Sequence, residues 1–216
     1  VPKTNTNIYS YLRFRNQIEM KYLTILFVLF ATSISAQTTW QKSILDWQAE
    51  MNREFADTAD SPLDEADLQN FKALDFYAPD SNYRVNATMI LVKDSKAFPM
   101  KTSTDRAPMY RVYGYLHFKI NGKACRLAAY QRIEFSTSDD YADYLFVPFT
   151  DQTNGKETYY GGRYIDIQIS TSGSYTLDFN MAYNPYCAYS DRWSCPLVPE
   201  ENTLNCKIEA GVKKFH

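Results

Sequence analysis

Histidine, glycine and known catalytic signatures are scarce in this chain. The 216 residues include 2 histidines and 7 glycines, and His117 is the only histidine away from the end of the sequence. There is no C-x-x-C, H-E-x-x-H or G-x-S-x-G motif, and no dinucleotide-binding glycine fingerprint. Because a metal site needs clustered cysteines or histidines, the sequence predicts no metal site and no cofactor.

A basic excess and a long apolar run are missing as well. Without residues 1–36, the chain keeps 19 Lys and Arg against 24 Asp and Glu, a net charge of −5. Phosphate binding needs a basic face, so neither nucleic acid nor an anionic membrane is an expected partner. The apolar run at residues 22–31 is shorter than the about 20 residues that a membrane span requires, and no span is expected in the mature chain.

The first 36 residues have the features of an upstream segment followed by a secretory signal peptide. Met20 and the lysine after it provide a charged start, residues 22–31 form an apolar core, and small residues precede Ala36. This order predicts a signal peptide that starts at Met20 and is cleaved after Ala36. The alternative is a buried helix of the folded domain. We expect an exported protein, periplasmic or secreted, with a single β-rich domain over residues 37–216.

Two helices are expected at the start of the mature domain. Apolar residues recur at helical spacing over residues 38–57, and charged residues occupy the opposite face. Ser61 as N-cap and Pro62 as first helical residue predict a second helix that ends near Leu74. Such apolar stripes pack onto a sheet or, alternatively, form a binding face.

Strands are expected after the helices. The 18 Tyr and 13 Phe against 7 Gly favour half-buried strands. Alternating patterns predict strands at residues 85–91, 144–149, 163–169, 175–181 and 205–210. Short connections between them favour an antiparallel sheet. The predicted fold is β-rich (α+β), an antiparallel β-barrel or sandwich with two N-terminal helices packed on it.

The clearest single element is a hairpin over residues 110–133. Its centre, Asn121-Gly122, favours a two-residue type I′ turn. That turn sets the register, in which Phe118 faces Cys125. It also places Val112 on the buried face of the hairpin. His117 then lies on the opposite face, across from an arginine and among tyrosines, and it is one candidate base.

Short motifs along the mature chain carry a family resemblance. They are Ser61-Pro62-Leu63, Leu74-Asp75-Phe76, Tyr83-Arg84-Val85, Tyr113-Gly114, Phe146-Val147-Pro148-Phe149, Thr153-Asn154-Gly155-Lys156-Glu157-Thr158-Tyr159, Gly162-Arg163-Tyr164, Asp178-Phe179-Asn180, Ala182-Tyr183-Asn184-Pro185, Cys187-Ala188-Tyr189, Cys195-Pro196-Leu197 and Glu209-Ala210-Gly211. In this order, they resemble the bacterial family known as domain of unknown function 1684 (DUF1684). The resemblance implies a shared fold and a shared site, but no reaction, because none is assigned to the family.

The loop at residues 151–164 is the first candidate site. It exposes two hydroxyls, an amide, an ammonium and a carboxylate over residues 153–158, and Gly161-Gly162 allows close backbone approach. Arg163 is the expected anchor for a small anion. The expected ligand-binding residues are Asn154, Lys156, Glu157, Tyr159, Arg163 and Asn184. The alternative is a solvated hairpin loop with Arg163 in a structural salt bridge.

The cysteine loop at residues 184–196 is the second candidate. In an oxidising compartment, the seven residues between Cys187 and Cys195 suit a small disulfide loop. Four cysteines allow three pairings, which the sequence does not choose between. Cys125 is expected to face the core as an apolar filler. The alternatives for the loop are a metal site and a thiolate nucleophile.

Three hypotheses for function follow. The first is an exported protein that binds a small polar or anionic ligand between the 151–164 and 184–196 loops. The second is a hydrolase that uses Glu157 or Asp178 as acid or base, with His117 as a further catalytic candidate. The third is a structural or partner-binding protein of the cell envelope.

Overall fold

The computed structural model describes residues 39–137 and 140–216 of the chain. It divides into two compact units, and the second, Ile44–His216, contains the sheet and the candidate site. The first, Val1–Ser43, is described only over residues 39–43, which are helical.

The predicted signal peptide lies outside the described residues. Within the described part of the chain, no helix combines the length and the apolar character needed to cross a membrane.

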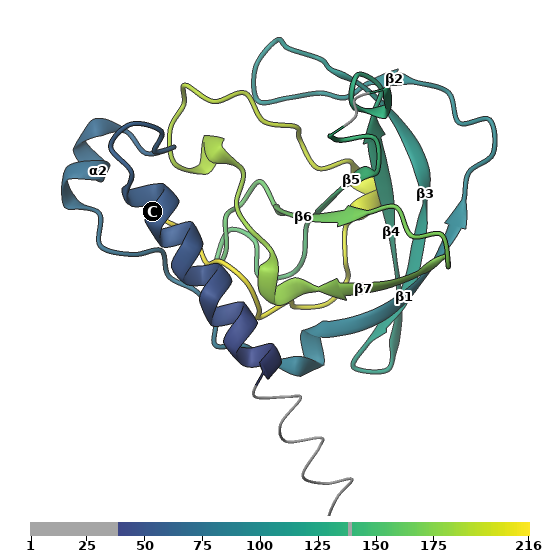
Figure 1. Ribbon diagram of the computed structural model, residues 1–216, viewed down its shortest axis with the longest axis horizontal. Helices are drawn as coiled ribbons and strands as arrows, with labels where there is room; N and C mark the ends of the chain where they lie inside the picture. Colours follow the sequence, from purple (N-terminus) through teal and green to yellow (C-terminus); the bar gives the residue numbers. More distant parts are fainter. Residues whose placement is uncertain (1–38, 138–139) are drawn as a thin grey trace, which may run out of the picture. The chain divides into compact units, whose positions relative to one another are not determined.

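One curled antiparallel sheet forms the centre of the second unit. Its strands are β1 (Arg84–Leu91), β2 (Phe98–Pro99), β3 (Met109–Ile120), β4 (Lys123–Arg132), β5 (Tyr144–Phe149), β6 (Arg163–Gln168) and β7 (Ser174–Asp178). They run in the order β6-β5-β4-β3-β1-β7, with β2 added beside β3. Among the described strands, β6 and β7 at the two ends form no ladder, so the sheet is a half-barrel (Figure 1). The β-rich antiparallel prediction is confirmed at this level.

The β3–β4 hairpin has the predicted register. Phe118 pairs with Cys125, and the turn residues Asn121 and Gly122 have φ of 49° and 78°, as a type I′ turn requires. The placement of Val112 on the same buried face is wrong. The register shifts between Val112 and Gly114, and this bulge moves Val112 to the aromatic cluster on the other face of the sheet.

A side chain replaces part of the ladder between β4 and β5. Pro148 has no N–H to donate, and the paired residues between these strands are limited to Tyr130 and Phe146. The amide of Asn202 fills the gap: it accepts from the N–H of Ala128 at 2.7 Å and donates to the carbonyls of Ala128 and Pro148. Asn202 is fully buried, so these bonds compensate for its desolvation.

The N-terminal helices are confirmed only in part. Within the second unit, residues 44–56 are helical, but the second helix, α2, spans only Glu65–Asn70. The prediction of Ser61 as its N-cap is wrong, because Asp64 occupies that position. Ser61 is buried instead, and its hydroxyl donates to the carbonyl of Phe55 at 2.6 Å, which ties the preceding segment to the end of the first helix.

The remaining helical segments are short 3₁₀ helices. They are η1 (Ser81–Tyr83), η2 (Phe135–Thr137), η3 (Phe179–Met181), η4 (Tyr186–Ala188) and η5 (Glu200–Asn202). The predicted strand at residues 175–181 therefore ends early, at Asp178. Its carboxylate accepts from the N–H of Asn180 at 3.1 Å and turns the chain into η3.

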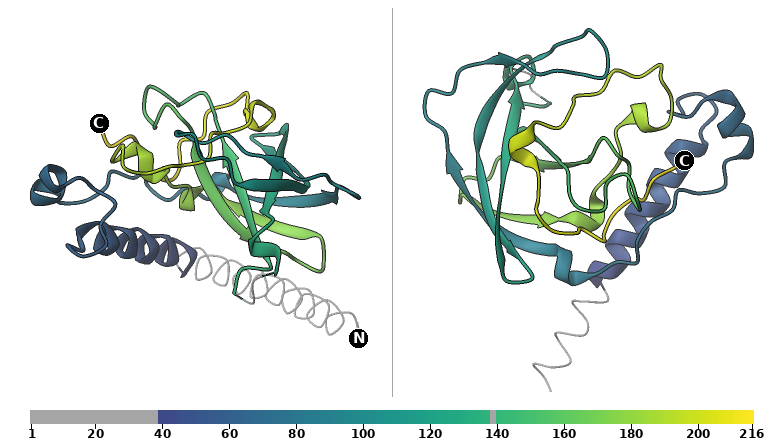
Figure 2. Two further views of the ribbon diagram at one scale, coloured as in Figure 1. Left: turned by 90° about the horizontal axis from the view of Figure 1, so that it is seen from above. Right: turned by 180° about the vertical axis from the view of Figure 1, so that it is seen from behind.

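The predicted strand at residues 205–210 is not formed. It belongs to the irregular segment that follows η5, residues 203–214, which is yellow in Figure 2 and crosses the sheet. We call this segment the strap. Its carbonyls at Ile208 and Ala210 accept hydrogen bonds from a buried arginine rather than from a neighbouring strand.

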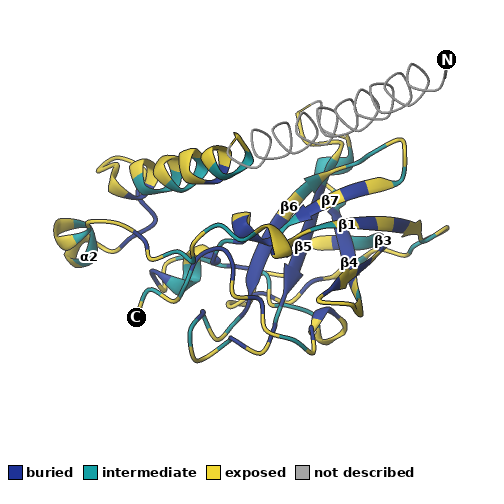
Figure 3. Cartoon of the chain, turned by 90° about the horizontal axis from the view of Figure 1, so that it is seen from below, coloured by how far each residue is buried: buried dark blue, intermediate teal, exposed yellow. Residues whose placement is uncertain are grey.

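Ile208 and Ala210 also fill the main core, together with Leu116 and Leu127 from the central hairpin. Figure 3 shows the buried residues gathered along the strands, while α2 is largely exposed. The core therefore lies between the sheet and the strap.

Candidate functional site

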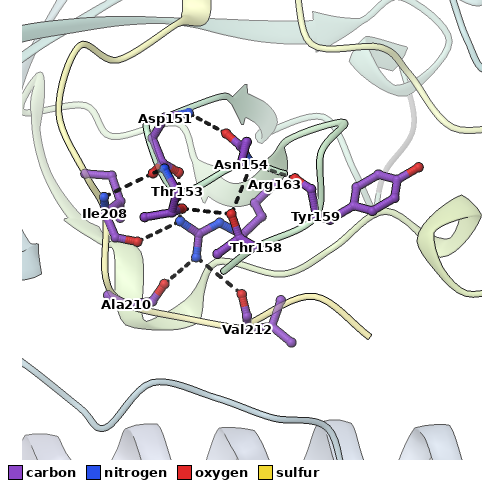
Figure 4. A network of polar contacts seen from close by, with 9 residues as sticks. All are labelled: Asp151, Thr153, Asn154, Thr158, Tyr159, Arg163, Ile208, Ala210 and Val212. Carbon is purple, nitrogen blue, oxygen red and sulfur yellow. Dashed lines mark hydrogen bonds and ion pairs between the residues drawn. The ribbon is translucent and has the colours of Figure 1, made fainter. Parts of the chain in front are cut away.

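The 151–164 loop has a half that faces the interior and a half that faces outward. Figure 4 shows Arg163 at the centre of a polar network, while the ring of Tyr159 points away from it. The two halves have different partners and different exposure, and they are taken in turn.

Arg163 occupies the interior half. Its guanidinium and the carboxylate of Asp151 are both 0% exposed, and Nη2 lies 2.9 Å from Oδ2. The same guanidinium donates to the carbonyls of Ile208, Ala210 and Val212 on the strap. Burial lowers the pKa of Arg163 and Asp151 opposes this effect; an arginine keeps its charge even so. This geometry is the structural ion pair that the sequence left open, and it does not support Arg163 as a ligand anchor.

Asp151 completes the network from the other side. Its Oδ1 accepts from the N–H of Thr153 at 2.8 Å and from the N–H of Ile208 at 3.1 Å. A buried ion pair is stable only when hydrogen bonds satisfy its remaining atoms. Backbone groups satisfy the pair at Asp151 Oδ1 and at both terminal nitrogens of Arg163, whereas Arg163 Nε is buried without a partner among the described residues. These bonds fasten the strap to the loop.

Gly162 is required by packing rather than by a ligand. It has φ of +95°, and a Cβ built there would lie 2.6 Å from a methyl of Val198 and 2.7 Å from the carbonyl oxygen of Phe149. The space beside Gly162, where we expected a ligand to approach the backbone, is therefore filled by Val198 and Phe149.

Asn154 links the two halves of the loop. Its side-chain oxygen accepts from the N–H of Asp151 at 2.5 Å, and its amide donates to Thr158 Oγ1 at 3.1 Å and to the carbonyl of Tyr159 at 2.6 Å. These internal bonds use the donors and the acceptor that we expected a ligand to meet. Asn154 thus positions Tyr159 rather than contacting the cavity.

The outward half of the loop forms one wall of a cavity of about 350 Å³. The other walls come from the η4 region and from the last residues of the chain. The lining residues are Gly155, Thr158, Tyr159, Tyr160, Cys187, Ala188, Asp191, Lys214, Phe215 and His216. Cavities that hold small ligands begin at about 300 Å³. The structure therefore brings the two loops singled out from the sequence to one cavity.

A thiol pair lies at this cavity. Tyr159 Oη is 4.0 Å from Cys187 Sγ, and the backbone N–H of Cys187 donates to Cys195 Sγ at 3.3 Å. Hydrogen bonding with the Cys195 thiol lowers the pKa of Cys187 to about 6, against the opposing effect of burial; the hydroxyls of Tyr159 and Ser103 add to the lowering. The pKa of Cys195 is raised by the same hydrogen bond and by burial. The surroundings thus favour the thiolate at Cys187 and the thiol at Cys195.

All four cysteines carry free thiols in the structure. The predicted Cys187–Cys195 disulfide is therefore not formed, although the two residues are neighbours. Cys125 and Cys206 form a second neighbouring pair, and burial, followed by the effect of Cys125, raises the pKa of Cys206 to about 11. Cys125 is partly buried and packs against the main core, so it faces the core as expected but is not enclosed by it.

Two charged side chains of the cavity were missed by sequence reasoning. Lys214 and Asp191 line it, and neither forms an ion pair with another described residue. The backbone N–H of Lys214 donates to the carbonyl of Glu157 at 3.0 Å, which fixes the strap beside the loop. A lysine near the end of the chain gives no signal in the sequence, because only folding brings it to the loop.

The other predicted ligand residues lie around the cavity rather than in it. Among the described lining residues, Tyr159 is the one that was predicted to bind a ligand. Asn184 is buried and donates to the carbonyl of Lys213 at 2.9 Å, so it holds the strap. Lys156 is exposed, and Glu157 pairs with Lys207 at 3.2 Å.

The three catalytic candidates make separate structural contacts. The hydrogen bond with Lys207 lowers the pKa of Glu157, which favours a carboxylate rather than a general acid. Asp178 caps η3, and His117 is exposed on β3 opposite Arg126. None of the three belongs to the described cavity lining, and no three His, Cys, Asp or Glu side chains cluster as a metal site among the described residues.

One of the comparisons with known proteins identifies the family. A family described as "Protein of unknown function (DUF1684)" matches residues 69–213. The chain is similar to the solution NMR structure of an uncharacterized protein from Haloarcula marismortui, with 34% identity and a TM-score of 0.64, over 83% of this chain and 96% of that one. No curated protein matches the chain. Because the match covers more than half of its length, the chain belongs to the DUF1684 family, as its motifs predicted.

Proposed function

We propose that this protein binds a small polar or anionic ligand in the cavity between the 151–164 loop and the η4 region. The observation that carries the proposal is the cavity of about 350 Å³, whose lining includes the polar residues Tyr159, Cys187, Asp191 and Lys214 from three distant segments. A concave site with a few convergent polar groups is the usual form of a small-molecule site.

Lys214 supplies the attraction for an anion. Lys214 is an exposed residue of the cavity lining and forms no ion pair with a described residue, so its ammonium is available to a carboxylate or a phosphate. Tyr159 and Tyr160 supply ring surface, with centroids 4.6 Å apart. Asp191 on the same lining favours a ligand that also carries a positive or a hydrogen-bond donor group.

We also propose that the protein is exported, to the periplasm or out of the cell. The order of charged, apolar and small residues before residue 37 supports this proposal. N-terminal sequencing of the protein purified from the producing cells tests it. The proposal requires a mature chain that begins near residue 37, and a chain that retains the apolar run contradicts it.

Ligand binding is tested with three probes in an NMR titration: benzoate, glutamate and inorganic phosphate. We expect at least one of them to shift the amide signals of Gly155, Tyr160, Cys187 and Lys214 together. Lys214→Gln should weaken that binding by about two- to fivefold, the usual range for an exposed charge pair. Lys207→Gln is the matched control, since Lys207 is exposed but pairs with Glu157 outside the lining.

A titration in which none of the three probes moves those four amides contradicts the binding proposal. Equal affinity in wild type and Lys214→Gln contradicts the role of the lysine as the anion contact.

A further inference from the structure

We propose that Cys187 and Cys195 act as an exchangeable dithiol pair, in which Cys187 attacks a small, negatively charged organic disulfide bound in the cavity and Cys195 resolves the product. This inference deepens the proposed function, because it rests on the same cavity as the binding site. It names a substrate class and gives the two thiols different tasks.

The first observation is the position of the two sulfurs relative to the cavity. Cys187 lines the cavity and is partly exposed, whereas Cys195 is buried and does not belong to the described lining. The backbone N–H of Cys187 contacts Cys195 Sγ at 3.3 Å, so the two side chains are neighbours. A ligand in the cavity therefore meets Cys187 first, with Cys195 directly behind it.

The second observation is that the surroundings favour a thiolate at Cys187. Tyr159 Oη lies 4.0 Å from its sulfur, and hydrogen bonds from Cys195 and from the Tyr159 and Ser103 hydroxyls lower its pKa. A thiolate that is partly exposed and stabilised by donors is the reactive form of cysteine. Lys214 on the same lining attracts a disulfide that carries carboxylates.

The third observation is that Cys195 is held in place. Its backbone N–H donates to Ser103 Oγ at 3.1 Å, and its carbonyl accepts from the N–H of Ser103 at 2.8 Å. A fixed second thiol beside the attacking one is what the resolving step needs.

The reaction balances as two exchanges. The Cys187 thiolate attacks one sulfur of R–S–S–R, a bond forms between Cys187 and that sulfur, and RS⁻ leaves with the electron pair of the broken bond. Cys195 then loses its proton to the released thiolate and attacks the Cys187 sulfur, which expels the second RS⁻. The protein dithiol is oxidised by two electrons to a Cys187–Cys195 disulfide, and the small disulfide is reduced to one RSH, which carries the Cys195 proton, and one RS⁻.

The second cysteine pair provides an internal comparison. Cys125 and Cys206 are also neighbours, but neither belongs to the described cavity lining, and the Cys125 thiol donates to the carbonyl of Lys123 at 3.7 Å. Burial and the effect of Cys125 raise the pKa of Cys206, so this pair should exchange slowly.

The test uses 5,5′-dithiobis(2-nitrobenzoate), an anionic aryl disulfide, on the full chain after reduction and removal of the reductant. In the Cys125→Ser/Cys206→Ser background, we expect release of two thionitrobenzoates per protein at pH 7. The initial rate should exceed that of the matched control, Cys187→Ser/Cys195→Ser, by about tenfold or more. Cys187→Ser alone should abolish this fast release of thionitrobenzoate, which we call the fast phase.

Cys195→Ala distinguishes the roles of the two thiols. It keeps the buried position apolar, and it should release one thionitrobenzoate and leave a stable mixed disulfide that peptide mass mapping places on Cys187. Cys195→Ser is the second variant if the alanine protein does not fold. Equal rates for the two pairs, a fast phase that survives Cys187→Ser, or a second release without Cys195 each overturn the inference.

Charge selection adds a further readout. Lys214→Gln should slow the reaction with this anionic disulfide by about two- to fivefold and leave the rate with cystamine, a cationic disulfide, no slower. Equal slowing with both disulfides would remove Lys214 from substrate selection.

Benzoate has no S–S bond and separates the two proposals. Benzoate binding without exchange overturns the dithiol inference alone. If no exchange occurs and none of the three probes binds, the site is overturned as well.

Discussion

The interior and outward halves of one loop use polar residues for opposite purposes. The side chains of Asp151 and Arg163 are fully buried, and their charged groups bond to each other and to backbone groups of the strap. Tyr159, from the outward half, meets Cys187 of the η4 region at a cavity that both residues line. A polar side chain of this loop contributes to stability where it faces the interior. It is available for chemistry where it lines the cavity.

The largest expected effect is on the interior half. Arg163→Met should lower the free energy of unfolding by about 3–5 kcal/mol, because it leaves the Asp151 carboxylate buried without a counter-charge. Urea unfolding measures this loss. Adding Asp151→Asn, which removes the uncompensated charge, should restore part of it. An Arg163→Met protein as stable as wild type contradicts the structural role.

Asn154→Ala should affect both halves. The residue bonds to Asp151 on one side and to the carbonyl of Tyr159 on the other. We expect a loss of about 1–3 kcal/mol in unfolding free energy, the usual cost of leaving such partners unsatisfied. Because Tyr159 also loses its support, alkylation of Cys187 in the folded protein should change as well. A stability loss without any change in the alkylation of Cys187 would mean that Asn154 does not couple the interior half to the cavity.

The pH dependence of thiol reactivity tests the outward half. Only the thiolate is alkylated, and the pKa of Cys187 is about 6, so its alkylation by iodoacetamide should be nearly constant from pH 7 to pH 8. It should fall about tenfold between pH 7 and pH 5. Cys195→Ala removes the main donor and should move the midpoint upward. A rate that keeps rising tenfold per pH unit up to pH 8 contradicts a lowered pKa.

The smallest expected effect is at Glu157. Its carboxylate pairs with Lys207 at the surface and does not belong to the described cavity lining. Glu157→Gln should leave Cys187 reactivity unchanged and hardly alter the unfolding free energy, because solvent screens an exposed ion pair. A large loss of ligand binding in this variant would mean that Glu157 contributes to the site, which would contradict the assignment of residues to the two halves.

Local patterns in the sequence predicted the sheet well. The Asn121-Gly122 turn fixed the β3–β4 register because both residues adopt positive φ readily. The bulge after Val112 was not predictable, since alternation gives no warning of an inserted residue. The predicted strand at residues 205–210 was wrong for a different reason: its backbone groups pair with the side chains of Arg163 and Asp151, which are distant in sequence.

The candidate site was predictable in its place but not in its residues. The two loops that form the cavity stood out by composition, and Tyr159 and Cys187 come from them. The sequence did not distinguish an exposed Arg163 from a buried one, because burial depends on the strap that covers it. Lys214 was missed for the same reason.

The most direct test of the division between the two halves measures two properties on two variants. Urea unfolding and the rate of reaction with 5,5′-dithiobis(2-nitrobenzoate) are compared for Arg163→Met and Cys187→Ser. We predict that Arg163→Met loses about 3–5 kcal/mol of stability. Cys187→Ser should lose the fast thiol reaction while its stability changes by about 1 kcal/mol or less. If Cys187→Ser destabilises the protein as much as Arg163→Met does, and the fast reaction persists, the outward half is structural too.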